Sequence, residues 1–275
     1  MATSVDERAV LRAAGEAGRL LRTVTDSKRP GHGEWNLGEL AVHMLHVVDF
    51  ELGTVRRDPV PDVADFAALG RYTVDYVAAE PSRDPAALAD RIESAAAEYA
   101  RLTAGLAGSL EYDWFGGTRL PLRAVHAHIV SELSVHSWDV AHAEGRAWSV
   151  PPDAALAALE DFVVPLVQAV GAAGSFGGPT AFVDPVKGRG FRACYAVQVQ
   201  GGQRRHFVFE DGALAVTDPV PGRPVDCRVW AEPTALLLVL WGRAGQWPAV
   251  ARGRMRAWGR KPWLATRLPS LLHTP

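Results

Sequence analysis

Residues 122–144 read LRAVHAHIVSELSVHSWDVAHAE, and this stretch decides the fold because it has the length and spacing of one long amphipathic helix. Val125, Ile129 and Leu133 recur every fourth residue, and Val140 continues the same apolar stripe. Gly145 follows directly and is a typical residue after a helix end. The stripe requires apolar partners, so we expect this helix to lie in a helical layer.

The rest of the first half supplies those partners. Asn36 is a good N-cap with Glu39 three positions on, and Pro85 suits the first turn of a helix. The spacing predicts long helices over 5–24, 36–57, 84–106 and 122–144, and a shorter one over 65–79. Four long helices with one longer crossover predict a four-helix bundle.

The composition changes at Val150-Pro151-Pro152, where we place a linker between a domain 1–150 and a domain 151–275. A helix over 153–170 comes first, and the apolar period then falls from 3.6 to 2. Strands are expected over 194–200, 205–210, 213–217, 226–231 and 254–258, with helices over 233–243 and 262–272. The predicted fold class is therefore mixed α+β: a helical bundle followed by a small domain on a mainly antiparallel sheet.

The composition excludes several classes of protein. Apolar residues make up 48% of the 275 residues and charged residues 22%, with a net charge of −2, so neither disorder nor a nucleic-acid or membrane partner is expected. The first residues lack the apolar core of a signal peptide, and a cytoplasmic location is the expectation. Cys194 and Cys227 are too few for a disulfide framework, and their strand positions predict buried, inert thiols.

Histidines cluster on the two central helices. His136 falls in the middle of the apolar stripe of 122–144, and Glu132 lies one turn earlier at its edge, with His128 and Asp139 just beyond. A buried carboxylate is costly without a partner, and a metal ion would satisfy both groups. On the helix 36–57, His43 flanks the core face, whereas His46 lies farther round toward solvent.

Two interpretations of these residues are open. His43, Glu132 and His136 together have the ligand count of a catalytic zinc site. Alternatively, His136 is a core histidine hydrogen-bonded to Glu132, and His43 is unrelated, because Glu-x-x-x-His is common in helices by chance. Spacing alone does not decide between them.

Three further segments carry a resemblance. EWNLGELAVHMLHV (34–47) resembles the Trp-x7-His signature of DinB-like proteins, and VSELSVHSWDVAHAEG (130–145) is similar to the Glu-x-x-x-His-x-Trp-Asp-x-Ala motif of the mycothiol-dependent maleylpyruvate isomerase family. The stretch from Gly253 to Leu272 resembles the end of that family's sterol-carrier-protein-like second domain. The resemblance covers nearly the whole chain, although its motifs are shared by family members with different reactions.

This resemblance implies a function. It assigns the metal ligands to His43, Glu132 and His136, with a divalent ion, expected to be zinc, and mycothiol as a low-molecular-weight thiol cosubstrate. The implied activity is cis–trans isomerisation of a small electrophile, or thiol transfer to it; an actinobacterial source is expected as well. The alternative is a non-catalytic metal-binding or small-ligand carrier protein with the same architecture. Substrate and oligomeric state cannot be read from the sequence.

Other residues have a functional and a simpler interpretation. Asp139 could orient a ligand histidine or form an ordinary ion pair, and His128 could support a ligand or contact substrate. Arg243 resembles a family arginine that could bind a carboxylate, or it is a charge at a helix C-terminus. His46, His126 and His142 are expected to be solvated. Five tryptophans are expected in the core or interdomain seam of the second domain, with an aromatic-lined pocket as the alternative: Trp230, Trp241, Trp247, Trp258 and Trp263.

Overall fold

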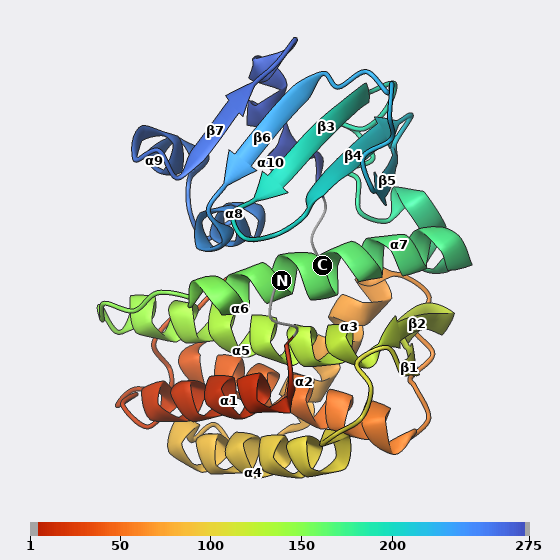
Figure 1. Ribbon diagram of the computed structural model, residues 1–275. Coiled ribbons are helices and arrows are strands. Elements are labelled where there is room, and N and C mark those ends of the chain that lie inside the picture. The colour runs from red at the N-terminus through yellow and green to blue at the C-terminus, as the bar shows by residue number, and fades with distance from the viewer. Residues whose placement is uncertain (1–4, 273–275) are drawn as a thin grey trace.

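The computed structural model describes residues 5–272, and its N-terminal half is a bundle of long helices (Figure 1). α1 packs on α4 and α5, and α2 packs on the same two helices. The predicted four-helix bundle is therefore confirmed, and its members are α1 (Glu7–Leu21), α2 (Leu37–Arg56), α4 (Pro85–Thr103) and α5 (Leu122–Ala143). The shorter α3 (Phe66–Ala79) lies in the crossover and packs on α2.

The start of α2 is closed by a capping box. The Asn36 side chain accepts a hydrogen bond from the backbone N–H of Glu39, and the Glu39 carboxylate accepts one from the backbone N–H of Asn36. This arrangement satisfies two of the free N–H groups of the first turn. It fixes where α2 begins, two turns before His43.

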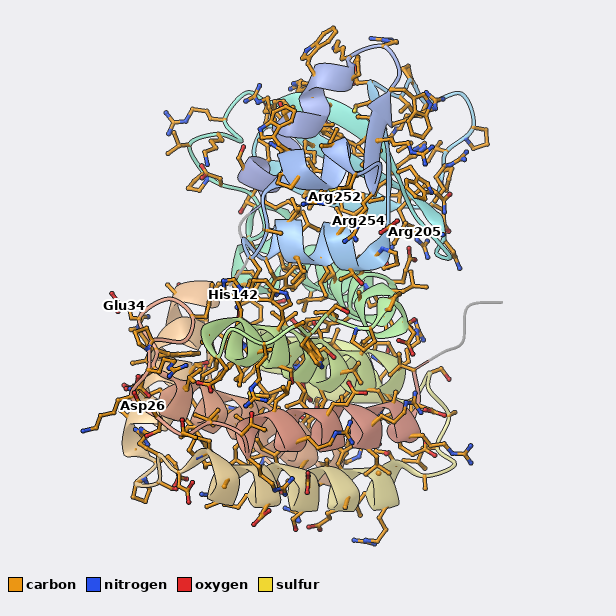
Figure 2. The ribbon with its side chains drawn as sticks, turned by 90° about the vertical axis from the view of Figure 1, so that its left-hand side faces the viewer. Asp26, Glu34, His142, Arg205, Arg252 and Arg254 are labelled. Carbon is orange, nitrogen blue, oxygen red and sulfur yellow. The ribbon has the colours of Figure 1, made fainter. Side chains whose placement is uncertain are left out.

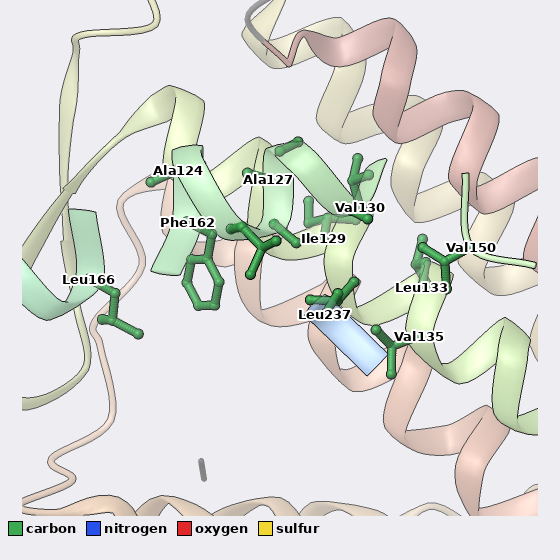
Figure 3. Close-up of a cluster of buried hydrophobic side chains, with 14 of the residues drawn as sticks. Ala124, Ala127, Ile129, Val130, Leu133, Val135, Val150, Phe162, Leu166 and Leu237 are labelled. Atoms are coloured by element: carbon green, nitrogen blue, oxygen red, sulfur yellow. The ribbon is translucent and has the colours of Figure 1, made fainter. Parts of the chain in front are cut away.

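One long helical rod lies between the bundle and the sheet, and it consists of α6 (Pro152–Ala157), a π-helical segment (Ala158–Val163) and α7 (Val164–Ala173) (Figure 1). Its underside packs on α5, and α6 contacts α8 (Pro233–Leu240) on the other side. Figure 3 shows Phe162 and Leu166 of the rod with Ala124, Ala127 and Ile129 of α5 in this buried layer. By length and composition alone the rod could cross a membrane, but half of its most apolar window is buried inside the fold.

The second half carries a five-stranded sheet in the order β5-β4-β3-β6-β7. β3 and β6 run parallel, and every other neighbouring pair in this sheet is antiparallel. The strands are β3 (Arg192–Val199), β4 (Arg204–Glu210), β5 (Ala213–Thr217), β6 (Cys227–Ala231) and β7 (Met255–Trp258). The mixed α+β class and the mainly antiparallel sheet are thus confirmed.

Several details differ from the sequence predictions. A hairpin of β1 (Glu111–Trp114) and β2 (Thr118–Pro121) stands before α5, in a stretch for which the sequence predicted no element. α9 (Gln246–Ala251) was also missed, and the expected last helix is divided into a 3₁₀ turn (Pro262–Thr266) and the short α10 (Leu268–Leu271).

The tryptophans of the second half do not form its core. Trp247, Trp258 and Trp263 are 63%, 48% and 63% exposed, so for them the expected core position is wrong. Trp230 and Trp241 are partly buried, and Trp241 packs against the core. The core of this half consists of aliphatic residues together with Tyr195 and several phenylalanines, among them Phe191 and Phe209.

Candidate metal centre

Three potential metal ligands meet between α2 and α5. The Nε2 atom of His43 lies 3.2 Å from Oε2 of Glu132, and Nε2 of His136 lies 3.3 Å from the same oxygen. The two imidazole rings are edge to face, with centroids 4.7 Å apart. One ligand atom from each of the three residues falls within 4.8 Å of the others, which is close enough for a single ion.

A chain of contacts behind His136 reaches the second half of the molecule. Nδ1 of His136 lies 2.9 Å from Oδ2 of Asp139. The same carboxylate accepts hydrogen bonds from Arg243, at 3.0 Å from Nη2 and 3.3 Å from Nε. Arg243 also donates to the carbonyl oxygen of Trp241 at 2.8 Å. The structure therefore brings Asp139 and Arg243 together, with the carboxylate between the guanidinium and the imidazole.

Burial and mutual contacts shift the pKa values of these groups. Burial lowers the pKa of His43, and the Glu132 carboxylate compensates only in part. Burial would raise the pKa of Glu132, but hydrogen bonds from His136 and His43 outweigh it and hold that pKa well below its usual range. Burial would also lower the pKa of His136, but its contacts with Asp139 and Glu132 outweigh burial and raise that pKa. The ionised Glu132 and the neutral His43 can therefore bind a divalent cation directly, whereas His136 would release a proton on binding.

The three residues line a cavity of about 420 Å³. Its walls are largely aromatic and include Phe50, Phe66, Trp114, Phe115 and Phe162. The cavity is bounded by α2, α3, α5 and the rod, and residues of the second half, among them Trp241 and Arg243, contribute to its lining. The space suits a small molecule and lies where the two halves of the chain meet.

A second polar cluster lies along the same cavity. Nδ1 of His128 is 2.5 Å from Oε1 of Glu51, and Nε1 of Trp114 donates to the same oxygen at 3.0 Å. Glu51 is fully buried. The His128 ring stacks on Phe162, with centroids 4.5 Å apart. His128 thus contacts no ligand of the predicted metal site but lines the space next to it.

The expectation that the remaining helix histidines are solvated holds only for His142. His142 is exposed, stacks on Trp138 and lies on the flank of the bundle (Figure 2). His46 is buried instead of facing solvent, because Tyr76 from α3 covers its ring. His126 is also buried, and its Nδ1 lies 2.9 Å from the hydroxyl of Tyr99 on α4.

Two groups of the site were missed in the sequence, Trp35 in the cavity wall and Glu51 behind it. Trp35 was quoted only as part of a motif, yet its ring centroid lies 4.8 Å from that of His43. Glu51 had a visible signal: it follows Val48 by three residues and Met44 by seven, so it interrupts the apolar stripe of α2 as His136 interrupts that of α5. Both cysteines are buried, as predicted, and burial raises the pKa of each thiol.

Comparisons with known proteins agree with this architecture. Residues 10–141 match the family described as mycothiol maleylpyruvate isomerase N-terminal domain. A crystal structure of a histidine-to-alanine mutant of the mycothiol-dependent maleylpyruvate isomerase superimposes with a TM-score of 0.52 at 12% identity, over 91% of this chain and 90% of that one. A second crystal structure of that isomerase gives a TM-score of 0.49 at 12% identity, over 86% and 88% of the two chains. No curated protein sequence matches the chain. At this identity the TM-score of 0.52 shows a shared fold.

Proposed function

Because residues 10–141 match the mycothiol maleylpyruvate isomerase N-terminal domain, we propose that the chain is a member of that family and a metal- and thiol-dependent enzyme that acts on a small electrophile. The single observation that carries the proposal is the meeting of His43, Glu132 and His136 at the wall of a cavity. A small-ligand carrier would need the cavity but not this donor set, whereas a non-catalytic metal-binding protein would need the donor set and differs from an enzyme only in turnover.

The residues present fit a divalent ion. Two imidazole nitrogens and one carboxylate oxygen converge, as in catalytic zinc sites that leave further positions open. Nδ1 of His136 donates to Asp139, so on metal binding Nε2 would give up the proton it shares with Glu132 and present its lone pair to the ion. Zinc is the expected ion, although this donor set also suits other transition metals.

When bound, the ion would supply the Lewis acidity that keeps a thiol deprotonated at neutral pH. The chain's own residues prepare the site: Asp139 orients the His136 ring, and Arg243 holds Asp139 through two hydrogen bonds. The aromatic walls exclude water from the thiolate and its partner. Neither buried cysteine lines this cavity, so the proposal takes the reactive sulfur from a separate thiol, and the family match supports mycothiol as that thiol.

The reaction we propose is addition of that thiolate to an electron-poor cis double bond. Rotation about the resulting single bond and loss of the thiol give the trans isomer; if the adduct is released instead, the enzyme is an S-transferase. A cavity of about 420 Å³ accommodates a small unsaturated acid such as maleylpyruvate. A cytoplasmic enzyme without nucleic-acid or membrane partners stays the expectation.

Metal analysis tests the site. The purified protein should hold about one divalent ion per chain, and His136→Ala or Glu132→Gln should each lower that content severalfold, because both ligands act together. His142→Ala is the matched control, since it removes an exposed histidine of the same helix. Full metal retention by both ligand variants would refute the site.

Turnover tests the reaction. The metal-loaded protein should isomerise maleylpyruvate only when mycothiol is present, as followed by the change in absorbance of the enol substrate. A protein that binds metal and thiol but neither isomerises cis-enedioates nor adds the thiol to them would be a carrier and not an enzyme.

A further inference from the structure

His128 presents one free ring nitrogen to the cavity. Its Nδ1 is committed to Glu51 at 2.5 Å, and the ring is held between the face of Phe162 and the edge of Trp114. The side chain lines the cavity and keeps 14% of its surface accessible. Nε2 is therefore the nitrogen available to a bound molecule.

Glu51 is the reason this ring is fixed. The carboxylate is fully buried, and its Oε1 receives both the His128 contact and the Trp114 N–H. Within residues 5–272, Oε2 has no hydrogen-bond partner. A buried carboxylate with so few donors is costly unless a positive charge lies beside it, and His128 is the group in contact with it that can carry one.

The electrostatics agree with this geometry. Burial lowers the pKa of His128, but the hydrogen bond and charge of Glu51 outweigh it, so the pKa is raised. Other titratable groups around the ring are His43 and His46 on α2, and Glu132 on α5. Compared with a free histidine, the His128 ring therefore favours its imidazolium form.

We propose that His128 is a catalytic proton donor for the substrate and that Glu51 is its positioning residue. This inference rests on the proposed thiol addition. The thiolate forms a C–S bond to the β carbon, and the π electrons move to the carbonyl oxygen, which takes the Nε2 proton of His128 as an enol. After rotation, the enol returns the proton to Nε2, the double bond forms again and the C–S bond breaks, so thiol and His128 are both regenerated.

The placement of His128 supports this role. His128 and Glu132 are four residues apart on α5, so their side chains project from one face about 6 Å apart. A small conjugated molecule can therefore receive sulfur near Glu132 and place its carbonyl oxygen near His128. The substrate class is a planar, carbonyl-conjugated alkene, which the surrounding Phe50, Phe115 and Phe162 rings accommodate.

Replacement of His128 tests the donor. His128→Gln should lower kcat about 10²-fold with a smaller change in KM, because the proton is needed only as charge develops. Metal content and mycothiol binding by calorimetry should be unchanged. Since this variant leaves Glu51 buried without its partner, the double variant Glu51→Gln/His128→Gln is measured beside it. His126→Gln is the matched control, a buried histidine of the same helix that does not line the cavity.

Replacement of Glu51 tests the positioning role. In the wild type, kcat should fall as the pH rises through the pKa of His128, and Glu51→Gln should move that fall to lower pH. ¹⁵N NMR of histidine-labelled protein gives a readout without turnover: at pH 7 the His128 ring, assigned from the His128→Gln spectrum, should show two protonated nitrogens, and Glu51→Gln should remove one proton.

The outcomes separate the two proposals. A neutral His128 ring at pH 7, or His128→Gln with wild-type kcat, overturns the inference and leaves the enzyme assignment intact. A protein that shows the Glu51-dependent imidazolium signal but no thiol-dependent turnover contradicts the proposed reaction, and with it the role of His128 as proton donor. The ion pair of His128 and Glu51 would then still be supported.

Discussion

Asp139 is the residue through which the second half of the molecule reaches the predicted metal site. It is almost fully buried and contacts His136 on one side and Arg243 on the other. Because such outer partners fix the tautomer and orientation of a ligand histidine, they affect metal affinity without touching the ion.

We predict that Asp139→Asn weakens metal binding about 10- to 100-fold, because the His136 ring loses its anionic partner and Arg243 becomes unpaired. Isothermal titration with zinc measures the change. Glu144→Gln is the control, since Glu144 forms an ion pair with Arg29 at the end of the same helix, away from the ligands. Equal affinity in Asp139→Asn and the wild type would show that Asp139 does not support the site.

Two buried histidines outside the predicted ligand set make the fold sensitive to acid. Burial lowers the pKa of His126 to about 4 and that of His46 to about 3. The unfolded chain binds a proton at each histidine near pH 6.5, whereas the folded chain does so only at much lower pH. Stability is therefore lost as the pH falls from about 6.5 to 4, because the unfolded state binds more protons in that range.

We predict that His126→Gln reduces this loss in the metal-free protein by about 3 kcal/mol at most. Urea unfolding at several pH values between 7 and 4 gives the slope, with the exposed His142→Gln as a control that leaves it unchanged. An unaltered slope in His126→Gln would mean that its ring is already protonated or accessible in the folded state.

The sequence predicted the positions of the ligand residues but not the burial of the other histidines. His43, Glu132 and His136 were found because each interrupts or flanks an apolar stripe, which is a property of its own helix. The burial of His46 and His126 was missed because it comes from other elements: Tyr76 covers the first and Tyr99 binds the second. Helical phase says which way a side chain points, but not which neighbour lies there.

Among the elements, α2 depends most on its first turn. The Asn36–Glu39 capping box begins the helix that carries His43 and Glu51, and most of the residues of α2 are buried. A defect at this end should therefore reduce the stability of the whole fold.

We predict that Asn36→Ala lowers the free energy of unfolding by about 1 kcal/mol. Asp65→Ala is the matched control, because the Asp65 side chain also caps the first turn of its helix, α3. α3 buries only Phe66 and Val77, so loss of this cap should lower the free energy of unfolding of the whole protein by less. Urea denaturation compares the two variants, and a larger loss in Asp65→Ala would contradict this ranking.

Element prediction succeeded where the periodic pattern was long. The helices of the bundle each repeat the apolar spacing over several turns, and β3 is an eight-residue strand that is buried almost throughout. The hairpin Glu111–Pro121 was missed because its strands have four residues each and enclose Gly116 and Gly117, both with positive φ, which read as a loop. The prediction of one continuous final helix was wrong for a similar reason, because Pro262 and Pro269 leave room only for single turns.

At the scale of the whole molecule, the rod of residues 152–173 packs against both halves of the chain. It covers α5 on one side and contacts α8 on the other (Figure 1). The division at 150/151 that the sequence suggests would separate the rod from the face of α5 that it buries (Figure 3).

We predict that a chain ending at residue 174 folds as a monomer, whereas one ending at residue 150 aggregates, because it exposes the apolar face of α5. Size-exclusion chromatography and circular dichroism of both chains test this, with the full chain as the reference. A soluble, helical, monomeric 1–150 fragment would instead support the division at 150/151.

The residues that line the cavity suggest how substrate preference can diverge among proteins with this fold. α5 contributes to the core, to the predicted ligands and to the layer beneath the rod, so selection leaves its inward residues little freedom. α3 contributes Leu69, Gly70, Thr73 and Val74 to the cavity while burying little of itself. Mutations there alter what enters without disturbing the chemistry, so substrate preference among descendants of this fold can change along α3 while α5 is inherited intact.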